Sequence, residues 1–309
     1  MAAAEIRQKP VVDAGELGFI TNLFVQTSLP HRDVSWTATG EPVTAWTRRN
    51  GLFSLTIQNG QVFNEATKRH EYVGLPFGTY ARLLFAWLGT EAVRTQSPRI
   101  GLGGSFGAFM RNLQIPRSGG PKGSEAALRN QLHRITRASL SWEYAGPVPR
   151  GATQRVDAGQ RIFPIESHAV FWDPNNPDRH STWESELTLN QVFFEHLVRH
   201  HVPVDMRVIR TLAQANAPLA MDIYVWLTSR MFTLQRATPM IPWPKLMEQM
   251  GSTHRNPSEF AREFKEHATK VLVLYPDAHL LYVKGGVRLK PSPTHVPVLA
   301  AVAAGPERG

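Results

Sequence analysis

The sequence contains no cysteine and no long apolar run. Without cysteine the chain can form neither a disulfide scaffold nor a thiolate metal site, and it has no cysteine nucleophile. The longest apolar stretches, such as residues 81–88, are too short to cross a bilayer, and Arg82 interrupts that one. The first ten residues carry Glu5, Arg7 and Lys9 with no apolar core after them, so we expect no signal peptide. These absences favour a cytoplasmic protein without membrane contact.

Catalytic motifs are equally scarce. The stretch GGPKGS at residues 119–124 lacks the Gly-Lys-Ser/Thr ending of a nucleotide-binding loop, and no HExxH pattern occurs. His200 and His201 are adjacent, so on a helix they would point about 100° apart and would not converge on one ion. Asp205 and Asp222 fall on separate predicted helices without a third carboxylate. We therefore expect no catalytic residue, no cofactor and no metal.

A nicking replication enzyme, which uses a tyrosine nucleophile beside a bound metal, is the enzymatic alternative. Tyr224 is the candidate nucleophile, but it lies between Ile223 and Val225 in an apolar helical pattern. This context predicts a buried aromatic whose hydroxyl finds one partner. The His-hydrophobic-His strand of such enzymes is also missing. The sequence therefore disfavours a nicking enzyme.

Positive charge is what the sequence has in excess. The formal net charge is +9, the pI is near 10, 42% of residues are apolar and 19% are charged. The apolar fraction is that of a globular protein, and the charge indicates an anionic partner. Because the basic residues fall on predicted helices and hairpins, we expect nucleic acid; a merely basic surface is the alternative.

The segment 239–291 has the element order of a winged helix-turn-helix, a DNA-reading unit. It predicts a short strand at 240–241, a short helix at 244–250, a basic helix at 258–274, and a hairpin at 280–289 that turns at 284–286. On a helical wheel of about 100° per residue, one arc of the basic helix is apolar and the opposite arc is polar. The apolar arc comprises Phe260, Phe264, Ala268, Val271 and Leu272, and the polar arc comprises Arg262, Glu266, Thr269 and Lys270, with Lys265 at its border.

The first half of the chain repeats this order. A buried helix is predicted over 76–95, a strand over 99–102, a helix over 105–113 capped by Ser105, and a helix over 124–138 capped by Ser124. Leu128, Leu132 and Ile135 of the last helix face inwards. Its outward stripe is Arg129, His133 and Arg137, flanked by Asn130 and Arg134. Strands at 140–144 and 161–172 would supply the hairpin.

The two halves therefore suggest a duplication, and residues 80–88 resemble residues 219–227. We predict an α+β fold of two tandem winged-helix domains. The expected divisions are a disordered segment 1–17, an N-terminal domain 18–173, a linker 174–183 rich in Asn, Asp and Pro, a C-terminal domain 184–297, and a disordered tail 298–309. Within them, residues 46–57 predict a hairpin bent at Asn50–Gly51, and residues 203–215 predict a helix begun by Pro203.

Four long phrases of this chain resemble the plasmid-encoded RepA-type replication initiators. They are GLPFGTYARLLFAWLGTEAVRTQSPRIGLG (74–103), FWDPNNPDRHSTWESELTLNQVFFEHL (171–197), PVDMRVIRTLAQANAPLAMDIYVWLTSRM (203–231) and VLYPDAHLLYVKGGVRLKPSPTHVP (273–297). The similarity runs from about residue 18 to 297. It implies a bacterial initiator that binds repeated double-stranded origin sites, opens nearby A·T-rich DNA, and recruits the host helicase and initiator. It also implies dimer and monomer forms, self-repression of its own gene, and a location with the plasmid or nucleoid.

The site residues come from the wheel, because the resemblance supplies none. We expect base contacts from Arg262, Lys265, Glu266 and Thr269, where Arg or Lys can fork onto guanine and Glu can accept from cytosine. We expect phosphate contacts from Arg255, Lys270, Lys284, Arg288 and Lys290. The stripe of Arg129, His133 and Arg137 would bind either adjacent DNA or a partner chain. The same residues would serve a plain transcriptional repressor equally well.

Overall fold

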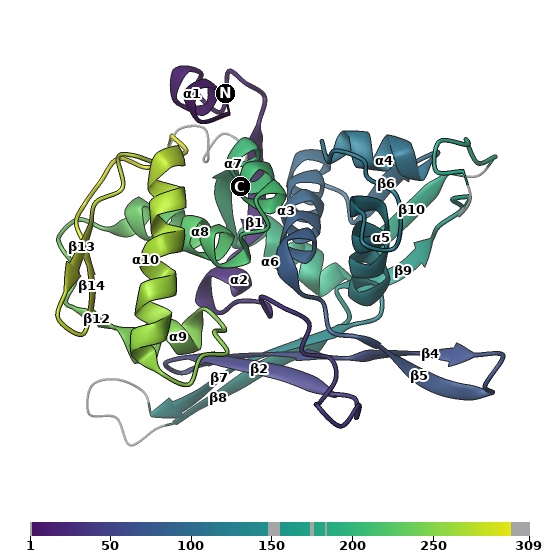
Figure 1. Cartoon of the computed structure of the whole chain (residues 1–309), viewed down its shortest axis with the longest axis horizontal. Coiled ribbons are helices and arrows are strands. Elements are labelled where there is room, and N and C mark those ends of the chain that lie inside the picture. The colour runs from purple at the N-terminus through teal and green to yellow at the C-terminus, as the bar shows by residue number, and fades with distance from the viewer. Residues whose placement is uncertain (1, 148–154, 174–175, 183, 298–309) are drawn as a thin grey trace.

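The computed structural model describes residues 2–147, 155–173, 176–182 and 184–297. Helices and antiparallel strands are mixed along the whole chain (Figure 1). Two units of like construction stand side by side, and a long sheet runs beneath both of them (Figure 1). One continuous set of buried apolar side chains extends through both units.

The second unit follows the predicted order. It contains α8 (Pro218–Thr233), β12 (Ile241–Pro242), α9 (Trp243–Gln249), α10 (Pro257–Leu274), β13 (Leu280–Val283) and β14 (Gly286–Leu289). The strands lie antiparallel in the order β12-β14-β13. Asn256 caps α10 by accepting a hydrogen bond from the Ser258 amide at 2.9 Å, and Pro257 occupies the first helical position. The expected helices and hairpin are confirmed to within one to three residues.

The first unit repeats this arrangement. It contains α3 (Gly78–Thr95), β6 (Arg99–Gly103), α4 (Phe106–Asn112), α5 (Ser124–Ile135), β9 (Ile165–Ala169) and β10 (Ser185–Leu189). The strand order β6-β10-β9 matches β12-β14-β13 position for position. Ser105 caps α4 as predicted, accepting from the Ala108 amide at 3.1 Å. Ser124 does not cap α5; its hydroxyl instead donates to the Pro116 carbonyl at 2.8 Å.

The expected hairpin of the first unit belongs elsewhere. Strands β7 (Ser139–Pro147) and β8 (Arg155–Ile162) join β2 (Ala45–Asn50) and β3 (Phe53–Gln58) in a four-stranded sheet, order β2-β3-β7-β8. The pair β7–β8 is thus an insertion after α5. Because Leu140 and Trp142 alternate inwards as β3 residues do, they complete the buried side of that sheet. The Asn50–Gly51 bend between β2 and β3 is confirmed.

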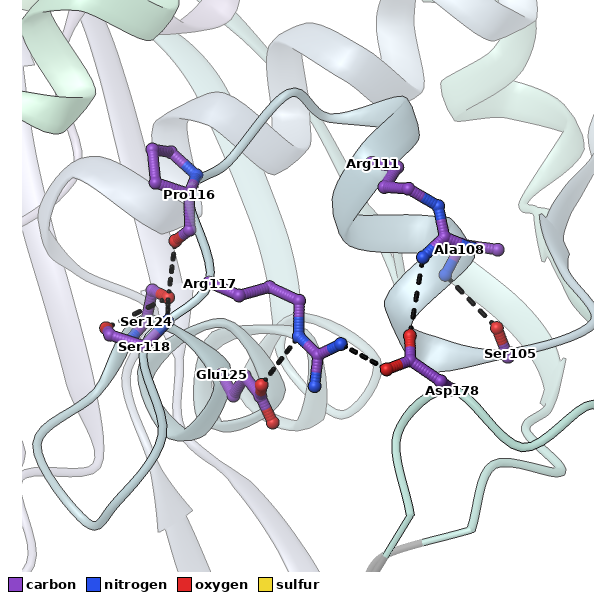
Figure 2. A network of polar contacts seen from close by, with 9 residues as sticks. All are labelled: Ser105, Ala108, Arg111, Pro116, Arg117, Ser118, Ser124, Glu125 and Asp178. Atoms are coloured by element: carbon purple, nitrogen blue, oxygen red, sulfur yellow. Dashed lines mark hydrogen bonds and ion pairs between the residues drawn. The ribbon is translucent and has the colours of Figure 1, made fainter.

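The expected linker 174–183 lies inside the first unit. It joins β9 to β10, which pair with each other, so β10, which falls in the expected second domain, completes the first sheet. Asp178 in this loop forms ion pairs with Arg111 of α4 and with Arg117 of the turn between α4 and α5 (Figure 2). Arg117 also binds Glu125 of α5 at 2.8 Å. The loop therefore fastens α4 to the turn before α5 instead of separating two domains.

The N-terminal segment is ordered where it was expected to be disordered. Helix α1 (Ala2–Gln8) packs against the second unit, and Ile6 and Val11 are buried. Arg7 donates to the carbonyl of Val273 in the last turn of α10 at 2.6 Å. These apolar contacts and the hydrogen bond to the end of α10 hold the N-terminal segment in place, which its composition did not predict. The expected tail 298–309 lies outside the described residues.

Pro203 begins no helix. It lies in β11 (His201–Asp205), which pairs antiparallel with β1 (Leu17–Thr21), and Asp205 caps the helix that follows. A proline is tolerated there because β11 has β1 on one edge only. The remaining elements are α2 (Leu23–Gln26), the hairpin β4 (Gly60–Asn64) and β5 (Arg69–Gly74), α6 (Gln191–Arg199) and α7 (Met206–Gln214).

A buried ion pair joins the two units. Arg82 of α3 donates through Nε and Nη2 to both carboxylate oxygens of Asp222 on α8, each at 2.7 Å. The same guanidinium donates to the carbonyls of Leu29 and Pro30. His31 adds a third contact to Asp222 at 2.8 Å. The buried charges of Arg82 and Asp222 are therefore paired with each other and hydrogen-bonded to their surroundings, as buried ions must be.

We predict that Arg82→Met destabilises the protein by about 3–5 kcal/mol, because it leaves Asp222 buried without its partner. Urea unfolding followed by circular dichroism measures the loss. The double variant Arg82→Met/Asp222→Leu should recover part of it, since no charge then remains buried. A single variant as stable as the wild type would show that the pair does not hold the units together.

The same pair predicts acid sensitivity. Burial alone would raise the pKa of Asp222, but the charge of Arg82 and the hydrogen bonds from His31 and Arg82 together lower it. A lowered pKa in the folded state contributes stability above the unfolded pKa of about 3.9, and that contribution is lost as the pH falls below it. Between pH ~5 and pH ~3 the wild type should therefore lose more unfolding free energy than the double variant does. Parallel losses would contradict this.

Candidate nucleic-acid interface

Helix α10 presents two chemically distinct sides. Phe260, Phe264, Ala268 and Val271 are completely buried, while Leu272 is half-buried. Trp226 of α8 meets Phe264 edge-on at 6.2 Å between ring centroids, and Trp243 of α9 lies 5.4 Å from the same ring. These contacts confirm the predicted apolar arc. They fix the opposite side of α10 towards solvent.

The exposed side of α10 carries the four predicted base-reading residues, but not all are available. Thr269 donates its hydroxyl to the Lys265 carbonyl at 3.0 Å, and Glu266 pairs with Lys270 at 3.3 Å. Arg262 and Lys265 are exposed and make no side-chain hydrogen bond or ion pair within the described chain. These two cations are therefore the ones free to contact an anion.

Arg262 and Lys265 line one groove. It holds about 840 Å³ between the first half of α10, the start of α9 at Trp243, and Gly285 at the hairpin tip. The Lys265 ammonium lies 5.4 Å from the Tyr282 ring centroid and 6.0 Å from that of Trp243. Trp243 and Tyr282 are stacked 6.4 Å apart. Two aromatic rings thus hold a lysine over the groove by cation–π attraction.

The predicted phosphate-binding residues divide between two sides. Val287 and Leu289 of β14 are buried, so Arg288, which alternates with them, points away from α10 and is exposed. Lys290 continues on that outer side, and Lys284 lies at the turn beside Gly285. Arg255 is exposed in the loop before α10, and Lys270 is paired with Glu266. The hairpin cations therefore do not share the groove of Arg262 and Lys265.

The first unit has a corresponding groove between α5 and the segment of β9. It holds about 650 Å³. All three residues of the predicted stripe line this groove. Residues from 168–172 line its other side. The lining includes Arg129, His133, Arg137, His168 and Trp172.

Burial and mutual repulsion shape the charges of this groove. Burial, followed by the charges of Arg137, His168 and Arg134, lowers the pKa of His133; burial and Arg137 likewise lower the pKa of His168. Both imidazoles are therefore neutral at neutral pH. The positive charge comes from Arg137 and from Arg129, whose guanidinium lies 3.8 Å over the Phe106 ring.

Arg134 does not flank the stripe as expected. It is buried, and it donates to Asp33 at 2.8 Å and to the Leu75 carbonyl at 2.9 Å. Arg134 lies within α5, on the buried face that includes Gln131 and Ile135, whereas Arg137 follows the end of the helix. The Arg134 side chain therefore points inwards and holds the segments before β2 and after β5.

Sequence reasoning missed Trp243, His168 and Trp172, which line the two grooves, and Tyr282, whose ring lies beneath the Lys265 ammonium. Trp243 and Tyr282 were not predicted because only polar positions were considered. His168 and Trp172 were not predicted because the hairpin strands of the first unit were misassigned. Their discovery required the pairing of β9 with β10.

Within the described ranges, no three His, Asp or Glu side chains come together as a metal site. Tyr224 is completely buried, as predicted, and its hydroxyl accepts from the Asp205 amide at 2.9 Å and lies 2.9 Å from His295 Nδ1. Burial raises the pKa of its phenol. Among the described helices, none is both long and apolar enough for a bilayer.

This chain is similar to solved structures and to one protein family. Two structures of RctB domains 2 and 3 are similar, one with a TM-score of 0.49 and 12% identity over 88% of this chain and 96% of that chain. The other, a SeMet derivative, has a TM-score of 0.48 and 11% identity over 87% and 96%. No curated protein matches. A family model described as "Plasmid encoded RepA protein" matches residues 75–244, more than half of the chain. This chain therefore belongs to the plasmid-encoded RepA protein family.

Proposed function

We propose that this protein is a plasmid replication initiator that binds repeated double-stranded sites at the origin. The observation that carries the proposal is the recurrence of one groove in two units. In each unit a solvent-facing helix and a hairpin with the same strand order enclose unpaired or half-buried cations. We interpret each unit as a winged helix, in which the second helix of the pair reads DNA and the hairpin is the wing.

In the second unit, α10 is the base-reading helix. Its 18 residues span about 27 Å, enough to lie along the major groove, which is about 12 Å wide. Arg262 and Lys265 are placed near its N-terminal half, where recognition helices contact base edges. Lys284 at the hairpin tip, with Arg288 and Lys290 on the outer side, would neutralise phosphates. Glu266, Thr269 and Lys270 remain weaker candidates because they are already hydrogen-bonded.

In the first unit, we assign the stripe of Arg129, His133 and Arg137 to a neighbouring DNA segment. The described lining of that groove contains no carboxylate, and its arginines are held in place by Phe106 and by Thr136. A concave surface with arginines and without carboxylates suits a phosphodiester backbone better than a second copy of a basic chain. The alternative partner remains a protomer in a dimer.

Family membership supports the remaining steps of the proposal. These are the opening of neighbouring A·T-rich DNA, the recruitment of the host helicase and initiator, an exchange between dimer and monomer, and action in the cytoplasm on the plasmid. We also propose that the protein is no enzyme, because Tyr224 is inaccessible to a DNA strand. A transcriptional repressor with the same grooves is the second candidate. Loss of plasmid maintenance on deletion of the gene, with its promoter supplied separately, separates the two.

We predict that Arg262→Ala and Lys265→Ala each cost about 1–3 kcal/mol of binding to the cognate origin repeat and relax its sequence preference. The reason is the loss of a forked or ammonium contact to a base edge. Fluorescence anisotropy on the repeat and on scrambled duplexes gives both quantities. Arg94→Ala, which removes an exposed arginine at the far end of α3, is the matched control. Wild-type affinity in both α10 variants would refute the assignment.

Salt dependence should identify the phosphate contacts. Replacing Lys284 by Ala removes one cation at the hairpin tip, so the slope of log affinity against log salt should become shallower by about one. Affinity should fall by a similar factor on cognate and scrambled DNA. An unchanged slope would place Lys284 away from the backbone.

Arg137→Glu tests the first groove. If the groove binds DNA, affinity for a duplex of two repeats should fall and the salt slope should decrease, while the sedimentation coefficient of the free protein stays the same. If the groove binds a partner chain, the oligomeric state should change instead. Arg99→Glu, exposed on β6 outside the groove, is the control for net charge.

A further inference from the structure

The groove of the first unit contains two histidines from different elements. His133 lies in the last turn of α5, and His168 lies in β9, which runs beside α5 (Figure 1). Solvent reaches both imidazoles, and neither makes a side-chain hydrogen bond or ion pair within the described chain. Both rings are therefore open to a ligand that enters the groove.

A cation lies beside these two imidazoles. Arg137 follows the end of α5 and lines the same groove. Its guanidinium donates to the Thr136 hydroxyl at 2.8 Å and to the His133 carbonyl at 3.2 Å, so it is held close to the end of the helix. Arg137 forms no ion pair among the described residues, and its charge acts on both His133 and His168. Each imidazole therefore has an uncompensated positive charge for a neighbour.

The carboxylates of this region lie by another cation. Glu125 and Asp173 both act on the charge of Arg129, and Glu125 is also paired with Arg117 at 2.8 Å. The charged and titratable groups that act on the two imidazoles are instead Arg134, Arg137 and, for His133, His168 itself. Nothing in this set favours an imidazolium.

A bound phosphate would change this balance. In the free protein, partial burial and then Arg137 lower the pKa of both imidazoles, and His168 and Arg134 add to the effect on His133. A phosphodiester in the groove would offset the charge of Arg137, and an imidazolium could donate a charge-assisted hydrogen bond to its oxygens. Each imidazole therefore gains a reason to bind a proton only when the groove is occupied.

We propose that DNA entering the first groove is accompanied by proton uptake on His133 and His168, which supply positive charge only in the complex. The proposal rests on the proposed function, because it needs DNA in this groove. It also distinguishes the two units. The groove beside α10 has no histidine among its described lining residues, and its free cations are Arg262 and Lys265.

The direction of the pH effect follows from linkage. A group whose pKa is higher in the complex than in the free protein takes up a proton on binding, so affinity rises as the pH falls through the interval between the two values. Here the interval begins below the ordinary histidine value of about 6.5 and extends above it. Affinity for a duplex of two origin repeats should therefore rise as the pH falls from ~7.5 to ~6.

Isothermal titration calorimetry of the full chain measures the uptake directly. The titrations with a duplex of two repeats are run at pH ~6.5 in two buffers that differ in ionisation enthalpy, and the difference in heat gives the number of protons bound. The wild type should take up about one proton per bound chain, shared between two imidazoles that are neutral when free. Repeating the titrations at pH ~7.5 and ~6 gives the change in affinity.

Glutamine variants locate the uptake, because glutamine is polar but does not titrate. The double variant His133→Gln/His168→Gln should take up almost no protons, and its affinity should change less with pH than that of the wild type. Each single variant should keep about half of the uptake. His70→Gln, exposed on β5 outside the groove, is the matched control and should take up protons as the wild type does.

The outcomes separate this inference from the proposed function. If the wild type binds the duplex without proton uptake, or if the double variant takes up as many protons as the wild type, the inference is overturned while origin binding stands. If the wild type binds no duplex at any of these pH values, the proposed function fails and the inference fails with it.

Discussion

The ion pair between Arg82 and Asp222 is the constraint on which the arrangement of the two units depends. It is buried, it joins the central helix of one unit to that of the other, and it also binds the backbone of the segment before the long sheet. A buried charge is tolerated only when its partner is held at hydrogen-bond distance. Sliding or rotating α3 against α8 would break this pair, so the relative position of the grooves on α5 and α10 is set by it. The continuous core between the units acts in the same direction.

The long sheet adds a second connection. Trp46 of β2 is buried and donates to the Ser28 carbonyl, and β2 also packs against α9 beneath the second unit. The inserted strands β7 and β8 extend the sheet from the first unit. Figure 1 shows the sheet running below both units. The duplicated parts are therefore joined by structure that belongs to neither copy, which explains why a division into two independent domains with a linker does not describe them.

The grooves illustrate how aromatic rings organise charge. Lys265 lies over Trp243 and Tyr282, and Arg129 lies over Phe106, so aromatic rings orient both cations in their grooves. Where a carboxylate is present, as in the pair of Glu266 and Lys270, the cation is partly compensated.

The sequence by itself determined the elements whose signal is local. The apolar arc of α10, the Asn256–Pro257 start, the hairpin at 280–289 and the burial of Tyr224 follow from periodicity, capping and turn chemistry, which act over a few residues. Only the tertiary structure decided which strands pair. β10 fell in the expected second domain and Pro203 of β11 was expected to begin a helix, because a strand's partner is chosen by long-range packing: β10 completes a sheet with β6 and β9, and β11 pairs with β1. The same holds for charge. Arg134 and Arg137 look alike in sequence, but Arg134 lies on the buried face of α5, and Arg137 follows the end of the helix and lines the groove.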